Sequence, residues 1–150
     1  MSRWLHTQTS ISLALAMQAL QALQAALNEA ESLQVKVSIA ILDAAGQLLH
    51  MAHMEGAPGL SREIARRKAA TAVAFGVSTA AWEERLPRCS PAVRQGLPLQ
   101  EGLALFGGGE PFLVSGCVAG GIGISGASEQ LDAQCAQAAV RCVERLLASD

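Results

Sequence analysis

Apolar and polar residues follow a helical period near the start of the sequence. Between residues 11 and 31, polar side chains recur every three or four positions, while Leu and Ala occupy most of the others. This spacing predicts an amphipathic helix, and Ser10 or Ser12 can cap its N-terminus. The polar stripe consists of Gln18, Gln21, Gln24, Asn28 and Glu31.

The period changes to two after this helix, which predicts β-strands. Apolar residues alternate from Val35 to Leu42, and residues 43–46 supply a turn before a returning strand at residues 47–54. A second hairpin is predicted at residues 112–119, with its turn at Ser115 and Gly116. Strands joined by such short turns are antiparallel, because parallel neighbours need connections of about a dozen residues or more.

Two further helices complete the predicted fold. One begins at Ser61 and runs to about Phe75, and the last follows Ser128, which can cap it. The turn-rich residues between them are predicted to form an ordered connection that Trp82 anchors, with a short helix near residues 79–86. The sequence therefore predicts a single α+β domain over residues 1–150, an antiparallel sheet with helices on both faces.

Glycines interrupt the apolar run that follows the turn at Ser115 and Gly116. They need a physical reason, because glycine inside a strand weakens it. Gly120, Gly121 and Gly123 mark a close approach of another backbone or a ligand. A helix or a second subunit packed on that face is one interpretation, and a flat ligand is the other. The four cysteines form no CxxC pair, so no metal site or redox dithiol is predicted.

Composition limits the classes of partner. Only 16% of the residues are charged and 51% are apolar, which favours a homo-oligomer, a dimer or larger, whose copies cover apolar surface. A net charge of -2 and 3% aromatic residues argue against binding to nucleic acid. No apolar run has the length of about 20 residues that a membrane span needs. We therefore expect a cytoplasmic protein without a membrane partner.

The charged residues suggest where a ligand could bind. Arg62, Arg66, Arg67 and Lys68 form a basic cluster on the helix that begins at Ser61, and Glu63 can pair with Arg67. This cluster is either a solvated helix face or an anchor for ligand carboxylates. No nucleophile, base and orienting group can be assembled, so catalytic residues are unknown and enzyme activity stays open.

The candidate binding site lies where three segments of the chain are expected to meet. These are the glycine-rich stretch at residues 107–109 with the neighbouring Glu110, the start of the basic helix, and the end of the first hairpin. A small-molecule ligand is expected there. His50 and His53 point to opposite faces of a strand and cannot share one metal ion, so no metal is predicted. The candidate residues are His53, Glu55, Gly56, Arg62, Arg66, Gly107, Gly108, Gly109 and Glu110.

Several strings together resemble the GlcG/HbpS-like family, also called the haem-degrading domain family. They are VSIAILDAAGQLL at 37–49, MEGAP at 54–58, KAATAVAFG at 68–76, FGGGEPF at 106–112 and GGIGISGAS at 120–128. The resemblance implies a profilin-like α/β/α domain that assembles into dimers and larger oligomers. It also implies haem or corrinoid as a cofactor, since some members bind these and others of unknown activity are encoded near catabolic genes.

The sequence departs from the family at positions that matter for ligand binding. Haem-binding members present a ligand from the first helix, often histidine, whereas no histidine occurs from Ser10 to Glu31 here. Met17 lies near that position, although a Met on an Ala/Leu helix is expected in the core. Family members usually carry Arg and Asp where His53 and Glu55 stand.

Three functions follow as hypotheses. The first is a small oligomeric accessory protein of a catabolic pathway that binds haem, another tetrapyrrole or a small organic acid. The second is an enzyme that acts on a small organic acid through His53 and the basic helix. The third is a non-catalytic structural oligomer whose ligand is unknown.

Overall fold

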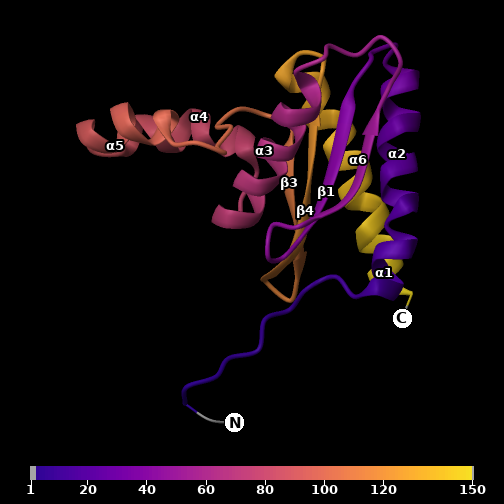
Figure 1. The fold of residues 1–150 in the computed structure, drawn as a ribbon, viewed down its shortest axis with the longest axis horizontal. Coiled ribbons are helices and arrows are strands. Elements are labelled where there is room, and N and C mark those ends of the chain that lie inside the picture. The colour runs from indigo at the N-terminus through magenta and orange to yellow at the C-terminus, as the bar shows by residue number, and fades with distance from the viewer. Residues whose placement is uncertain (1–2, 150) are drawn as a thin grey trace.

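The computed structural model describes residues 3–149, which form one four-stranded sheet and helices on both sides of it (Figure 1). The strands are β1 (Ser38–Asp43), β2 (Leu48–His53), β3 (Gly109–Val114) and β4 (Cys117–Ser125). The α-helices are α1 (Leu13–Gln18), α2 (Leu20–Ser32), α3 (Ser61–Phe75), α4 (Trp82–Arg85), α5 (Pro91–Gly96) and α6 (Glu129–Ala148). Short 3-10 helices are η1 (Thr79–Ala81), η2 (Leu86–Arg88) and η3 (Leu97–Leu99).

The sheet has the strand order β2-β1-β4-β3, and all neighbouring strands are antiparallel. Both predicted hairpins are therefore confirmed, as β1–β2 and β3–β4. The two hairpins join through β1 and β4, where Ser38 pairs with Ser125. This arrangement leaves β2 and β3 as the edge strands of the sheet.

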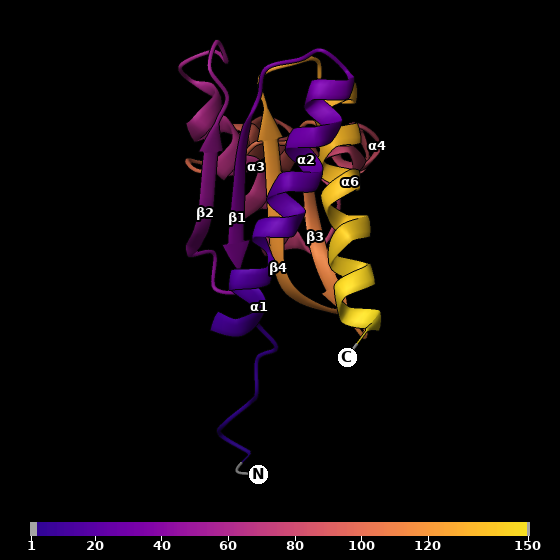
Figure 2. The same ribbon diagram turned by 90° about the vertical axis from the view of Figure 1, so that its right-hand side faces the viewer.

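Helices α2 and α6 cover one face of the sheet, and α3 covers the other (Figures 1 and 2). The period of two in β1 produces this division, since Ile39 and Ile41 point to the larger core and Ala40 and Leu42 point to α3. The predicted α+β fold with helices on both faces of an antiparallel sheet is confirmed.

Two glycines of β4 allow α3 to lie directly on the sheet. A Cβ atom at Gly123 would collide with the carbonyl oxygen of Ala65, and it would lie 2.6 Å from the amide nitrogen of Ala69. A Cβ atom at Gly121 would lie 2.9 Å from the Val73 side chain. Close packing of a helix, one of the two interpretations of these glycines, is thus the observed one at both positions. Gly120 instead lies against Leu42 and the Ile11 side chain.

The predicted first helix is present but is divided between Gln18 and Leu20. At the division, the imidazole Nε2 of His50 donates a hydrogen bond of 2.6 Å to the carbonyl oxygen of Ala16. A side chain that captures a helix carbonyl is a known cause of a kink, and we attribute the break to it. Ser12 is the N-cap. No helix within residues 3–149 combines the length and apolar character needed to cross a membrane.

The expectation that Met17 lies in the core is wrong. Its side chain is 62% exposed, and Leu13 and Leu20, one turn away on either side, are 80% and 47% exposed. The face that packs inward is lined by small residues, including Ala16 and Ala19. Because the alanine stripe is the buried one, the long apolar side chains at 13, 17 and 20 lie on the exposed side of the helix.

The connection at residues 76–102 is ordered and largely helical. The segment from η1 to η3 projects away from the sheet and its covering helices (Figure 1), and we call residues 79–99 the arm. Trp82 anchors its base as predicted, because it is 5% exposed and packs edge-on against Phe75 with ring centroids 4.8 Å apart.

Gly123→Ala should destabilise the fold, because the added methyl group would occupy the space of the Ala65 carbonyl. Overpacking of this kind costs about 1–3 kcal/mol, and we expect the upper end of that range or more. Denaturant unfolding measures the difference. Gly59→Ala is the matched control, since its Cβ would meet nothing within 4 Å. Equal unfolding free energies for the two variants would contradict the close packing of α3 on β4.

Candidate functional site

A buried ion pair joins α3 to α6 at the end of the sheet. The Nζ atom of Lys68 lies 2.9 Å from Oδ2 of Asp132, and the two side chains are 1% and 2% exposed. Nζ also donates to the carbonyl oxygen of Ile124 at 2.9 Å, and Oδ1 of Asp132 accepts from the amide of Ala127 at 3.0 Å. The pair therefore connects both helix layers through β4.

Burial acts on both charged groups. It lowers the pKa of the Lys68 ammonium, and the nearby carboxylate of Asp132 opposes part of this shift. Burial likewise raises the pKa of the Asp132 carboxyl, and Lys68 opposes it. Each charge is therefore tolerated inside the protein because the other is present, and loss of one partner would leave the other buried and uncompensated.

The predicted glycine-rich stretch wraps around this pair. A Cβ atom at Gly108, where φ is +124°, would lie 2.8 Å from Nζ of Lys68 and 2.5 Å from the carbonyl oxygen of Ile124. The amide of Gly107 donates to the Glu129 carboxylate, and that of Gly109 donates to the Thr79 hydroxyl. These two amides therefore have acceptors within the protein.

An open cleft of about 380 Å³ lies over the ion pair, and we call it the ion-pair cleft. The Phe106 ring, 46% exposed, covers Lys68 with its centroid 4.9 Å from Nζ. The cleft forms where the loop before α3, the residues before β3 and the start of α6 meet, close to the predicted position of the site. Its lining is Pro58, Leu60, Ser61, Ile64, Lys68, Phe106, Ser125, Gly126, Ala127, Glu129 and Asp132.

The basic cluster is smaller than the sequence suggested, because Lys68 is buried and does not belong to its exposed face. Glu63 pairs with Arg67 as predicted, at 2.9 Å, and also with Arg66 at 2.7 Å. Arg62 is exposed at the start of α3. The helical period contained the missing signal, since Lys68 is three positions after Ala65 and four before Ala72, and both of these are buried.

His53 belongs to a chain of hydrogen bonds that ends at the cleft. Its Nδ1 lies 2.6 Å from Oγ of Ser38, which lies 2.8 Å from Oγ of Ser61, and Ser61 donates to the carbonyl oxygen of Pro58. Because that carbonyl can only accept, Ser38 donates to Ser61 and His53 donates to Ser38. The imidazole therefore does not act as a base toward either hydroxyl, and no activated serine nucleophile results.

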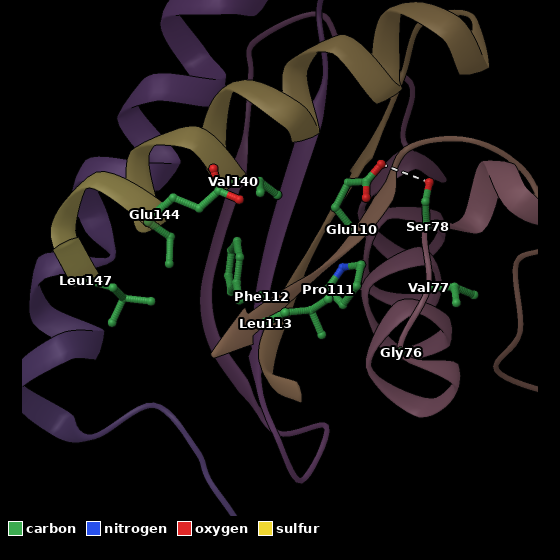
Figure 3. A pocket seen from close by; sticks show the side chains of 11 residues that line it. Gly76, Val77, Ser78, Glu110, Pro111, Phe112, Leu113, Val140, Glu144 and Leu147 are labelled. Atoms are coloured by element: carbon green, nitrogen blue, oxygen red, sulfur yellow. Dashed lines mark hydrogen bonds between the residues drawn. The ribbon is translucent and has the colours of Figure 1, made fainter. Parts of the chain in front are cut away.

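The remaining residues of the predicted site fall in two places. Glu55 and Gly56 lie exposed in the turn after β2, where Gly56 has a φ of +85°. Glu110 lies apart from the ion-pair cleft and lines a second pocket of about 340 Å³ at the free edge of β3 (Figure 3). We call this the edge pocket. The expectation that Glu110 shares one pocket with the start of α3 is therefore wrong.

The described residues offer no ready metal site. No group of three or more His, Cys, Asp or Glu side chains that could hold a metal ion occurs within residues 3–149. Cys135 and Cys142 are buried on α6, and burial raises the pKa of the Cys135 thiol to about 11. These two cysteines pack in the core as small apolar residues.

Comparison with known proteins identifies the family of this fold. Residues 15–141 match the family described as haem degrading protein HbpS-like. The chain belongs to the HbpS-like family. Over 126 residues this HbpS-like chain is 37% identical to the corrinoid adenosyltransferase PduO of Citrobacter freundii, which covers 82% of the chain and 37% of PduO. The chain thus spans little more than a third of the length of that relative.

Solved structures share the fold of this HbpS-like chain over most of its length. The crystal structure of the Klebsiella pneumoniae protein ORFY has 30% sequence identity and a TM-score of 0.81, and covers 96% of this chain and 97% of ORFY. The crystal structure of PduOC in complex with haem has 32% identity and a TM-score of 0.77, and covers 89% of this chain and 95% of PduOC.

Asp132→Ala should lower the free energy of unfolding by about 3–5 kcal/mol, because it leaves the Lys68 ammonium buried without its carboxylate. The double variant Lys68→Met/Asp132→Leu should recover most of this loss, since it removes both charges and keeps the volume filled. Denaturant unfolding measures both. Glu63→Ala, which breaks exposed pairs, is the control and should cost about 1 kcal/mol or less. An equal cost for Asp132→Ala and Glu63→Ala would contradict a tight buried pair.

Proposed function

We propose that this HbpS-like chain is an accessory protein that binds a haem-type or corrinoid tetrapyrrole on the exposed face of α1. In this proposal Met17 is the candidate axial ligand of the metal. The binding face, which we call the α1 face, is the apolar surface of Leu13 and Met17 on α1 and of Leu20 at the start of α2. A bound tetrapyrrole would supply the metal chemistry, and the chain would supply the thioether and an apolar surface for the ring.

The exposure of Met17 is the observation that carries this proposal. A thioether that is 62% exposed does not fill a gap in the core, so packing does not explain it. Thioether sulfur is an established axial ligand of haem iron. The leucines one turn before and one turn after it are also exposed, and they would cover one face of a macrocycle. The family resemblance supports this position, because haem-binding members present a ligand from the first helix.

The relatives support the class of ligand. PduOC has been crystallised with haem, and PduO carries a corrinoid in its name. Because the chain matches only part of PduO, we propose binding and not adenosyl transfer. We also propose that copies of the chain associate, since the exposed apolar side chains of α1 and of the arm, such as Leu99 at 82%, favour a covering partner.

The arrangement of the helices restricts where ligand carboxylates can be held. Helix α3, which carries Arg62 and Arg66, covers the face of the sheet opposite to α2, and α1 leads directly into α2 (Figure 1). A tetrapyrrole on Met17 would therefore not reach these arginines of the same copy. A small organic acid in the ion-pair cleft is the second candidate, and the observation that favours it is an open cleft lined by Ser61 and Ile64 at the start of α3.

Haem titration followed by visible absorption tests the proposal. Wild-type protein should show the bands of a thioether-ligated haem, and Met17→Ala should lose them and bind about tenfold more weakly, which equals about 1.4 kcal/mol. Met17→His should restore ligation, because imidazole is the stronger and commoner haem ligand. Arg62→Ala, on the opposite face, is the matched control and should bind haem as the wild type does.

Light scattering on the same samples measures the assembly. We expect a dimer or larger oligomer at micromolar concentration, and a monomer would contradict the association of copies. An unchanged haem spectrum in Met17→Ala would exclude Met17 as the ligand. If haem affinity instead fell in Arg62→Ala, the cleft beside α3 would be the binding site and the α1 proposal would be wrong.

A further inference from the structure

The edge pocket is separate from both surfaces to which a function has been assigned. It lies between the C-terminal half of α6 and the outer side of β3, and residues 76–78, which follow α3, close one end (Figure 3). Its volume of about 340 Å³ accommodates a small organic molecule. The lining residues are Gly76, Val77, Ser78, Glu110, Pro111, Phe112, Leu113, Val140, Val143, Glu144 and Leu147.

The charge of this pocket is of one sign. Of the described residues that line it, Glu110 and Glu144 are the charged ones, and both are acidic. The rest of the lining is mostly apolar, and Figure 3 shows Val140 between the two carboxyl groups and the Phe112 ring below them. An apolar cavity with carboxylates and no cation complements a molecule that has an aliphatic body and a positive charge.

Glu110 is the carboxyl group of the pocket that a hydrogen bond holds in place. Its Oε1 accepts a hydrogen bond of 2.8 Å from the Ser78 hydroxyl, and no donor within residues 3–149 pairs with its Oε2. Burial raises the pKa of Glu110, and the hydrogen bond from Ser78 offsets part of that shift. The carboxylate therefore lacks a compensating cation, and its second oxygen can accept from a ligand.

We propose that the edge pocket binds a primary aliphatic amine, whose ammonium group pairs with Glu110 and whose chain lies along Phe112 and Val140. An ammonium donates up to three hydrogen bonds and carries the charge that Glu110 lacks. Glu144 lies at the other end of the apolar floor (Figure 3), where it would pair with the second ammonium of a diamine. A diamine should therefore bind more tightly than a monoamine.

The strand at the pocket favours a small molecule over an added peptide strand. β3 is an edge strand, and such strands can pair with the backbone of another chain. Pro111 lies in the part of β3 that borders the pocket and has no N–H group to donate. Side chains, and the Glu110 carboxylate in particular, are therefore the groups that would recognise the ligand.

Calorimetric titration at pH 8 with three probes of similar length tests this inference. The probes are n-butylamine, 1,4-diaminobutane and 1-butanol. We expect both amines to bind and the uncharged alcohol not to bind. Glu110→Gln should weaken both amines about tenfold or more, because it removes the charge and keeps the shape. Glu144→Gln should lower the affinity of the diamine to that of the monoamine and leave n-butylamine unchanged.

Two controls separate binding from folding and from general acidity. Glu31→Gln, on the exposed side of α2, should leave both affinities unchanged. Thermal unfolding at pH 8 should show Glu110→Gln folded and no less stable than the wild type, since the variant lacks a half-buried charge. Binding should also strengthen as pH rises through the raised pKa of Glu110, because only the ionised carboxylate pairs with an ammonium; Glu144 is the other titratable group of the lining.

Three results would overturn the inference. They are equal binding of butanol and butylamine, wild-type affinity in folded Glu110→Gln, and an equal loss in Glu31→Gln. Since Met17 and the edge pocket lie in different parts of the molecule, failure of the haem proposal and failure of amine binding are distinguishable in these titrations.

Discussion

The close contact between α3 and β4 is the constraint on which the rest of the structure depends. Glycine at 121 and 123 removes the Cβ atoms that would hold the helix away from the sheet. Lys68 can then reach past the end of the sheet to Asp132 at the start of α6. The glycine-rich stretch before β3 closes over this ion pair, and Phe106 covers it from the cleft. Helix packing, the buried charges and the position of the ion-pair cleft thus have one common cause.

The fold presents three surfaces of different chemistry in different places. The α1 face is apolar and carries an exposed thioether, the ion-pair cleft is apolar with a neutralised charge pair beneath it, and the edge pocket is acidic. Of the nine residues proposed from the sequence, Glu110 lines the edge pocket, and none belongs to the α1 face. The separation of the three surfaces means that ligands of different charge can be assigned to different surfaces and tested independently. The His53 network leaves both of its serine hydroxyls without a base.

The sequence predicted those features that depend on local periodicity. The period of two and the short turns defined both hairpins, and the strand glycines indicated a close approach. Contacts between residues far apart in the sequence could not be predicted in this way. Lys68 was grouped with Arg66 and Arg67 by adjacency, although the buried pair depends on a carboxylate 64 positions away. Glu110 was separated from its expected neighbours because β3 lies at the sheet edge beside α6. Met17 was assigned to the core because its exposure depends on which helix stripe contacts the sheet.

Nitrogen NMR of the lysine ammonium groups tests the central claim most directly. The chain contains two lysines, the buried Lys68 and the exposed Lys36, so each spectrum includes its own control. The account predicts that the Lys68 ammonium protons exchange slowly with water and show contacts to the Phe106 ring, while those of Lys36 exchange rapidly. Equally rapid exchange at both lysines would contradict a sealed ion pair between α3 and α6, and with it the arrangement that the fold depends on.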